Sequence, residues 1–80
     1  MFEELADSRK VVGFKQVSRS IKAGELERVY VAQDADEELK NELLAAAAAS
    51  GVVCVMAPGK KRLGELCGIS VSAACAGILK

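Results

Sequence analysis

The pattern of hydrophobic and polar positions divides the 80-residue chain into alternating strand-like and helix-like segments. Short apolar runs bounded by turn residues predict strands at residues 10–13, 28–33, 52–56 and 73–79. Helical periodicity and helix end signals predict helices at residues 2–9, 15–24, 34–51 and 60–68. This alternation predicts an α/β fold, a three-layer α/β/α sandwich with a small four-stranded mixed sheet. We expect residues 1–80 to form this single domain.

Residues 34–51 carry the clearest helix pattern. Asp34, followed by Glu37 three positions later, matches a capping box; acidic residues occupy the first turn, and Gly51 is placed to end the helix. The residues expected on its buried face are Leu39, Leu43, Leu44 and Ala47. The alanine run should let this helix approach its neighbours closely.

The helix that follows Gly13 has one polar, basic face. Residues spaced by three or four positions share this face, namely Lys15, Ser18, Arg19 and Lys22. Val17 and Ile21 lie four apart on another face and should hold the helix to the sheet, and Gly24 should end it. The pattern therefore predicts a helix that presents a stripe of positive charge.

The charges balance over the whole chain but are sorted along it. Eleven basic residues offset eleven acidic ones, yet residues 9–22 contain five basic residues and no acid, whereas residues 25–42 contain seven acids. Residues 60–62, "KKR", form a second basic cluster. The basic stripe that starts at Lys15 and the cluster 60–62 each begin a helix directly after a strand. An alternating sandwich should therefore bring them to the same end of the sheet. Such a local basic surface favours a nucleic acid as the partner.

The residue inventory narrows the kind of nucleic acid. Phe2, Phe14 and Tyr30 are the only aromatic residues, too few to stack a run of single-stranded bases. A helix start with Lys15 and Gln16 suits the groove edges and phosphates of a folded target instead.

Several other functions are disfavoured by the composition. The chain has no histidine, no C-x-x-C pair and no complete phosphate loop at residues 59–61, so we expect no metal, no cofactor and no enzymatic activity. Cys54, Cys67 and Cys75 are expected to be reduced. Cys54 and Cys75 should be buried in strands, while Cys67 is the thiol expected to approach the surface.

The chain also lacks the patterns of membrane and secreted proteins. Its longest apolar run, residues 43–49, is far shorter than the roughly 18 residues of a membrane-spanning helix. The acidic start "MFEELADSRK" does not resemble a secretory signal. We therefore expect a cytoplasmic protein with no membrane partner.

Three segments together resemble a known family. "VVGFKQVSRSIKAG", "VYVAQDAD" and "KKRLGELCGI" are similar, in order and spacing, to the kink-turn-binding ribosomal proteins of the L7Ae/L30e superfamily, and most of all to its short bacterial, YbxF-type members. The similarity extends from about Lys10 to Leu79. It implies an α/β/α sandwich that binds RNA kink-turns, in which a bulge adjoins tandem sheared G·A pairs.

The resemblance also implies which residues contact RNA. The family's Gly-x-Asn-Glu-x-x-Lys motif, which contacts guanine edges, corresponds to Gly13, Lys15, Gln16 and Arg19. Its pocket for an extruded nucleotide corresponds to Asp36, Lys60 and the loop 68–71. The full set of expected RNA-binding residues is Gly13, Phe14, Lys15, Gln16, Arg19, Lys22, Asp36, Lys60, Lys61, Arg62, Gly68, Ile69, Ser70 and Val71.

This chain departs from the family motif at its central positions. Lys15 replaces the family's Asn, Gln16 its Glu and Arg19 its Lys. Lysine can donate to guanine O6 and N7, and Gln16 can both donate and accept. Losing an acid and gaining a base should raise nonspecific affinity for RNA. The glycine before the stripe is expected to let the backbone approach the RNA closely.

These observations favour a monomeric, non-enzymatic protein that binds kink-turn-like structured RNA, in the ribosome or in a regulatory RNA such as a riboswitch, and not DNA. Two alternatives stay open. The acidic helix segment 34–42 could contact a basic protein partner, in which case RNA binding would be no stronger than that of a neutral protein. A small thiol enzyme would depend on Cys67 and lose activity on Cys67→Ser.

Overall fold

The computed structural model describes residues 9–80, and the helix expected at residues 2–9 lies outside this part of the chain apart from Arg9. The elements run in the order β1 (Lys10–Val12), α2 (Phe14–Lys22), β2 (Leu26–Ala32), α3 (Glu37–Ser50), β3 (Val53–Ala57), α4 (Lys60–Leu66) and β4 (Cys75–Leu79). The predicted alternation is confirmed for these residues. The largest shifts at the strand starts are in β2, which begins two residues earlier than expected, and β4, which begins two residues later.

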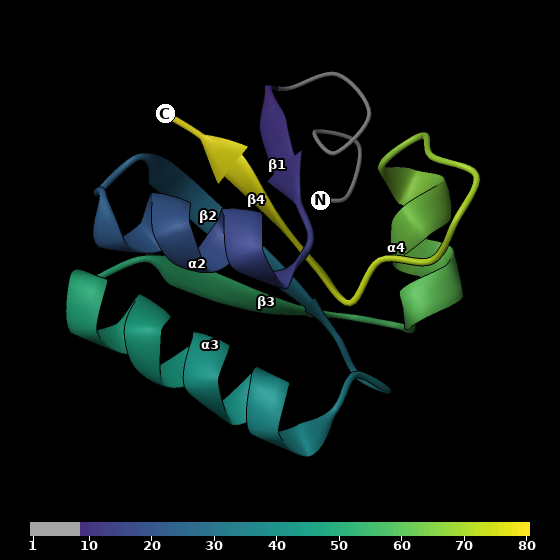
Figure 1. Ribbon diagram of the computed structural model, residues 1–80, viewed down its shortest axis with the longest axis horizontal. Helices are drawn as coiled ribbons and strands as arrows, with labels where there is room; N and C mark the ends of the chain where they lie inside the picture. Colours follow the sequence, from purple (N-terminus) through teal and green to yellow (C-terminus); the bar gives the residue numbers. More distant parts are fainter. Residues whose placement is uncertain (1–8) are drawn as a thin grey trace.

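The sheet is four-stranded and mixed, with the strand order β1-β4-β2-β3 (Figure 1). β2 and β3 are parallel, whereas β4 is antiparallel to both β1 and β2. β1, β2 and β3 therefore run in one direction and end at the same edge of the sheet. We call this the carboxyl edge; α2, α3 and α4 all begin there.

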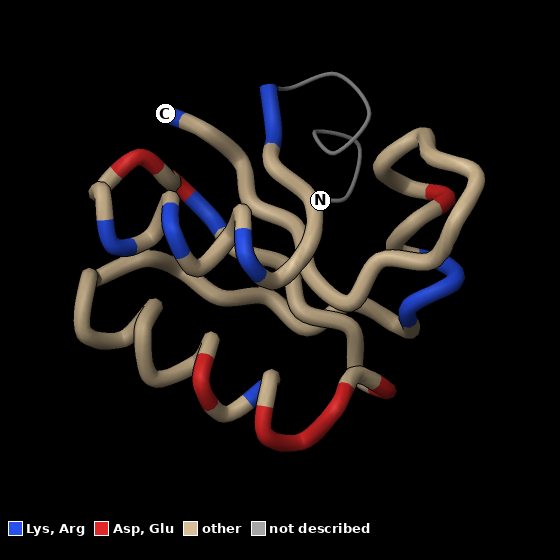
Figure 2. Tube along the Cα trace, viewed as in Figure 1, with Lys and Arg blue, Asp and Glu red and all other residues tan. Residues whose placement is uncertain are grey.

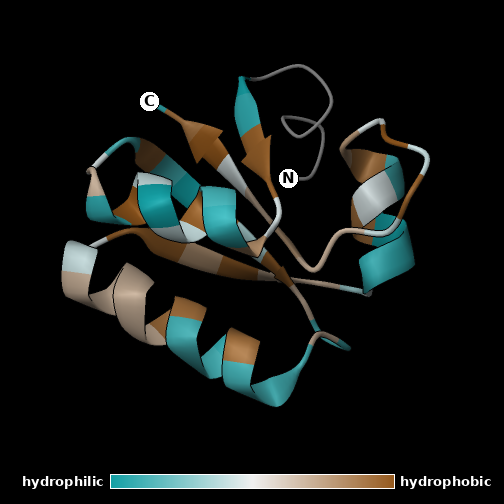
Figure 3. Cartoon of the chain, in the orientation of Figure 1, coloured by the Kyte–Doolittle hydropathy of each residue, from teal (hydrophilic) through white to brown (hydrophobic). Residues whose placement is uncertain are grey.

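Helices cover both faces of the sheet, which makes the protein the three-layer α/β/α sandwich that the sequence predicted (Figure 1). Val29 and Val31 of β2 pack in the layer of α2 and α3, whereas Tyr30 and Ala32 pack in the layer of α4. Residues in a strand alternate between faces, so a strand covered on both sides must be apolar throughout. In Figure 3, brown and tan accordingly predominate along the strands.

The expected buried face of α2 is confirmed. Val17 and Ile21 are fully buried against the sheet, and the helix ends at Lys22, two residues before Gly24 adopts a positive φ of 71°. The stripe residues of α2 therefore lie on the side that faces away from the sheet.

Two expectations for α3 are wrong. The helix begins at Glu37 with Asp36 as its N-cap, and no side chain caps it, so Asp34 does not form the predicted capping box. Asp34 lies in the turn before α3 and accepts a hydrogen bond from the backbone N–H of Lys60 at 2.8 Å. Leu44 is 41% exposed although Leu43 is fully buried, because no strand lies beyond β3 to cover it.

The position of β3 at the sheet edge also changes the expected burial of its residues. Val53 is 58% exposed, and Cys54 is only half-buried, so the prediction of full burial for Cys54 is wrong. Cys75, in the interior strand β4, is fully buried as predicted.

Candidate nucleic-acid interface

Backbone hydrogen bonds join the starts of α2 and α4 at the carboxyl edge. The N–H of Gly13 donates to the carbonyl of Cys75 at 3.0 Å, and the N–H of Ala73 donates to the carbonyl of Lys60 at 3.0 Å. Residues 73–75 thus connect both helix starts, and the Asp34–Lys60 bond attaches the turn before α3. The two basic clusters emerge at one end of the sheet, as the sequence predicted, although their helices lie on opposite faces.

The first turns of α2 and α4 carry basic residues, although the start of a helix favours acidic ones. α2 has Lys15 in its first turn and α4 has residues 60–62, and neither first turn contains an acid (Figure 2). The positive end of a helix dipole disfavours nearby cations, typically by about 0.3–1 kcal/mol each. α3, at the same edge, has the stabilising arrangement, with Glu37 and Glu38 in its first turn. The two basic starts therefore favour an anionic partner at the expense of helix stability.

The basic stripe of α2 is exposed and electrostatically uncompensated. Lys15, Arg19 and Lys22 are exposed, and within residues 9–80 none of them forms an ion pair. In contrast, Arg62 of α4 pairs with Glu65 at 3.2 Å, and Lys40 of α3 pairs with Glu37 at 3.2 Å. α2 thus presents three exposed cations without an ion pair, and Lys60 and Lys61 of α4 also form none within the described chain.

Two hollows lie on either side of α2. The first, which we call the β1-side hollow, has a volume of about 500 Å³ and is lined by Arg9, Val11, Gln16, Arg19, Ser20, Gly24, Glu25, Leu79 and Lys80. The second, the α3-side hollow, has a volume of about 400 Å³ and is lined by Phe14, Lys15, Ser18, Arg19, Lys22 and Glu42. Lys15 and Gln16, although adjacent in sequence, therefore line different hollows, and Arg19 lines both.

The loop 68–72 is held against α4 by a glycine. Gly64 is buried in α4, and a Cβ added there would overlap the carbonyl oxygen of Val71 and lie 3.0 Å from the carbonyl carbon. The N–H of Ile69 also donates to the carbonyl of Gly64 at 3.1 Å. This packing leaves the Val71 side chain 67% exposed. The structure thus places loop residues expected to bind RNA at the surface, beside the helix that starts with residues 60–62.

Gly13 has a conformation that other residues rarely adopt. Its φ of 100° and ψ of 153° lie in a region that is essentially restricted to glycine. A Cβ at this position would meet no atom within 4 Å, so the backbone turn, and not crowding inside the protein, requires the glycine. The space around Gly13 is open to a partner.

The structure does not support Cys67 as a reactive thiol. Cys67 is 5% exposed, which contradicts the expectation that it approaches the surface. It packs beneath α4 in the same core as Leu63. Burial raises the pKa of all three thiols, and raises that of Cys75 to about 12. Within residues 9–80, no cluster of potential metal ligands is found.

Sequence reasoning missed two residues that shape this edge. Asp34 was assigned to helix capping, but it organises the start of α4. Gly64 was not singled out, although an isolated glycine in a helical pattern indicates a site of close packing. Both act between segments distant in sequence, which a local pattern does not reveal.

The fold and this edge define a small three-layer protein with cationic helix starts gathered at one end of its sheet. The chain belongs to the ribosomal protein L7Ae/L30e/S12e/Gadd45 family, whose sequence profile matches residues 3–80. This membership confirms the resemblance drawn from the sequence. The family is non-enzymatic, in agreement with the prediction that this protein is not an enzyme.

Similar proteins cover nearly the whole chain. RNA-binding protein YbxF of Geobacillus stearothermophilus is 38% identical over 80 residues, which span 99% of this chain and 98% of that protein. An RNA-binding protein of Geobacillus thermodenitrificans is 36% identical over the same length. Among solved structures, the Giardia lamblia 15.5kD RNA binding protein has a TM-score of 0.86 at 29% identity and matches 99% of this chain and 68% of its own. A structure from Bacillus halodurans, at 18% identity and a TM-score of 0.90, supports the fold alone.

No helix within residues 9–80 has both the length and the apolar character needed to cross a membrane.

Proposed function

We propose that this protein binds structured RNA of the kink-turn type through its carboxyl edge. The observation that carries the proposal is the basic first turn of α2, open at Gly13, unpaired, and connected through residues 73–75 to the basic start of α4. Membership of the L7Ae family and the RNA-binding relatives support it. A cytoplasmic location accords with this function and stays a prediction.

In this proposal the residues at the edge have distinct roles. Lys15 and Gln16 contact the guanine edges of the tandem G·A pairs, approaching from the two sides of α2. Arg19 and Lys22 contact phosphates along the same helix, as do residues 60–62 on α4. Asp36 and the loop 68–71 receive the extruded nucleotide, for which the exposed Val71 offers an apolar contact. Phe14, the half-buried first residue of α2, packs against the core and lines the α3-side hollow together with Lys15.

The test compares base contacts with phosphate contacts. We would measure binding of the wild type, Lys15→Ala and Lys22→Ala to a kink-turn and to the same RNA with its G·A pairs changed to Watson–Crick pairs. Lys15→Ala should cost about 1–3 kcal/mol on the kink-turn and much less on the duplex, because the paired edges lie in a groove too narrow for side chains.

Lys22→Ala is the matched control, since it removes the same charge from the same exposed stripe at the last residue of α2. It should weaken both RNAs alike. If the wild type binds both RNAs equally, the kink-turn proposal is wrong and only a general basic surface stands. If neither RNA binds this protein more tightly than it binds a neutral protein, the better hypothesis is that the acidic segment 34–42 binds a protein partner. The thiol-enzyme alternative is disfavoured by the burial of Cys67.

A further inference from the structure

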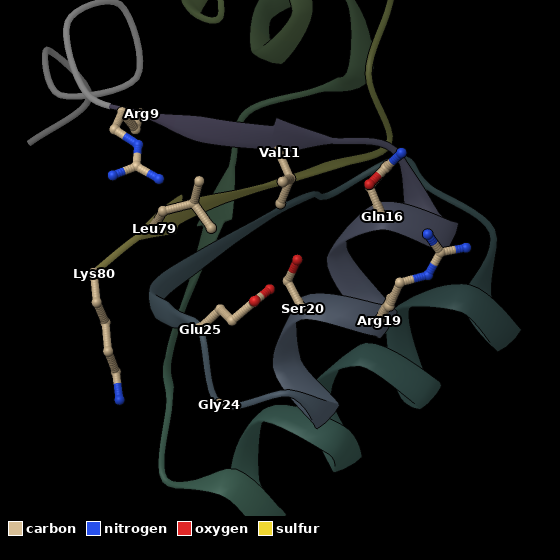
Figure 4. A pocket seen from close by; sticks show the side chains of 9 residues that line it. All are labelled: Arg9, Val11, Gln16, Arg19, Ser20, Gly24, Glu25, Leu79 and Lys80. Carbon is tan, nitrogen blue, oxygen red and sulfur yellow. The ribbon is translucent and has the colours of Figure 1, made fainter.

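The β1-side hollow contains polar groups that the proposed kink-turn interface does not use. It lies where α2 leaves the β1–β4 side of the sheet uncovered. Its lining residues come from β1 and the residue before it, from α2, from the turn after α2 and from the end of β4 (Figure 4). Val11 and Leu79 form its apolar floor. Its remaining polar residues are Arg9, Ser20, Glu25 and Lys80, in addition to Gln16 and Arg19, which it shares with the kink-turn interface.

Ser20 is the most informative of these residues. It is 5% exposed and is the only buried polar residue among residues 9–80. Its hydroxyl group points into the hollow (Figure 4) and makes no side-chain hydrogen bond within the described chain. Among the described residues, no fully buried side-chain nitrogen or oxygen lacks a hydrogen-bond partner, so this unbonded hydroxyl is reached from the hollow. It is therefore available to a partner that enters the hollow.

Glu25 gives the hollow an unusual charge pattern. Its carboxylate points toward Ser20 (Figure 4), and within residues 9–80 it forms no ion pair, although Arg9, Arg19 and Lys80 line the same hollow. A simple phosphate site would not include a free carboxylate, because like charges repel. The ligand that suits this hollow must therefore combine a negative group for the arginines with hydrogen-bond donors for Glu25.

We propose that the β1-side hollow binds a guanosine nucleotide. The guanine Watson–Crick edge presents two adjacent N–H donors, which match the two oxygens of the Glu25 carboxylate. Adenine and cytosine each place an acceptor beside the amino group, and uracil offers a single N–H between two carbonyls. Val11 and Leu79 contact the flat base, Ser20 donates to or accepts from it, and one of Arg9 and Arg19, which lie at opposite ends of the hollow (Figure 4), contacts the phosphate. A volume of about 500 Å³ accommodates one nucleotide.

This inference goes beyond the kink-turn proposal, since it uses the side of α2 away from Lys15. The same guanosine chemistry has two possible sources, a free nucleotide or an unpaired guanosine in a bound RNA. The two sources share every contact named above.

The first experiment titrates guanosine, adenosine and uridine 5′-monophosphates into the full chain, with binding followed by amide chemical shifts. We expect guanosine monophosphate to bind about tenfold more tightly than the other two. Glu25→Gln should weaken guanosine monophosphate about tenfold, as removal of a charged hydrogen-bond partner does, and leave the others unchanged. Glu27→Gln is the matched control, because Glu27 is an exposed acid two residues away that does not line the hollow.

Ser20→Ala tests the hydroxyl that faces the hollow, with Ser18→Ala, in the α3-side hollow, as its control. Ser20→Ala should weaken guanosine monophosphate severalfold, and Ser18→Ala should not. Equal binding of all three nucleotides, no detectable binding, or an unchanged guanosine preference in Glu25→Gln would each overturn the inference.

The second experiment separates the sources. A kink-turn RNA with one unpaired flanking guanosine is compared with the same RNA carrying uridine there, for the wild type and Glu25→Gln. If the wild type prefers the RNA with guanosine and Glu25→Gln does not, the ligand is a nucleotide of the RNA. If the wild type shows no such preference but still binds guanosine monophosphate, the ligand is a free nucleotide. Lys15→Ala is included in both experiments. If it loses the preference for the kink-turn but binds guanosine monophosphate as the wild type does, the kink-turn interface and the β1-side hollow are separate sites.

Discussion

Gly64→Ala should loosen the loop 68–72 even though alanine is the better helix former. An added Cβ would overlap the carbonyl oxygen of Val71 and lie 3.1 Å from Cα of Ser72. Both atoms belong to the backbone, so no flexible side chain can move aside. The loop must shift away from α4, and this shift strains the bonds from Ile69 to Gly64 and from Ala73 to Lys60.

The magnitude follows from three contributions. Overpacking a buried position costs about 1–3 kcal/mol, and a weakened backbone hydrogen bond costs about 1 kcal/mol more. Replacing glycine by alanine inside a helix by itself raises the free energy of unfolding by up to about 1 kcal/mol. We therefore expect the free energy of unfolding to fall by about 1–3 kcal/mol.

Urea unfolding of the wild type, Gly64→Ala and Glu65→Ala would measure this effect. Glu65→Ala is the control in the same helix, since it removes only the exposed ion pair with Arg62 and should change stability by less than about 0.5 kcal/mol. The displaced loop should also reduce the preference for kink-turn over duplex RNA. A Gly64→Ala protein that is about 1 kcal/mol more stable than the wild type would show that helix propensity dominates and that the loop does not pack against α4.

Four further predictions concern the thiols, Gly13 and the phosphates. A thiol reagent at pH 8 should modify half-buried Cys54 first and Cys75 last; rapid labelling of Cys75 in the native protein would contradict its burial in β4. The pKa of the Cys75 thiol is about 12 in the folded chain, against an ordinary value of 9.0. Between these two pH values the thiol loses its proton only in the unfolded chain. The free energy of unfolding should therefore fall as the pH rises from 9.0 to about 12. Gly13→Ala should destabilise the protein by about 1–3 kcal/mol through backbone strain, whereas Gly59→Ala, at an extended φ of −179°, should have little effect; equal stabilities in thermal unfolding would refute this. RNA affinity should fall with salt with a log–log slope near −2 to −3, as expected if about three of the five basic side chains assigned to phosphates each neutralise one phosphate, and a salt-independent affinity would contradict the phosphate contacts.

The order of elements and the buried faces of β2 and α2 were determined by the sequence itself. The apolar run of β2 requires cover on both faces, and Val29 and Tyr30 do pack in opposite layers. The spacing of Val17 and Ile21 fixed which side of α2 meets the sheet and therefore which side presents Lys15 and Arg19. Because strand and helix periods are local properties, the residues that carry them are enough to predict these features.

The carboxyl edge was partly predictable for the same reason. Helices that follow parallel strands begin at one end of a sheet, so the basic segments at Lys15 and at residues 60–62 could be placed together from their order alone. Their connection through residues 73–75 could not, since it depends on β4 entering between β1 and β2 in the antiparallel direction.

Only the tertiary structure decided which surfaces stay open and which residues act across the chain. The position of β3 at the edge exposes Val53 and leaves Leu44 uncovered, although both belong to apolar runs typical of a core. Asp34 meets Lys60 across 26 positions, and Ser20 and Glu25 face a hollow completed by Leu79. Sheet order and the contacts of distant segments arise from the packing of the whole chain, and a local pattern contains no information about which distant residue will fill, or leave open, the space beside it.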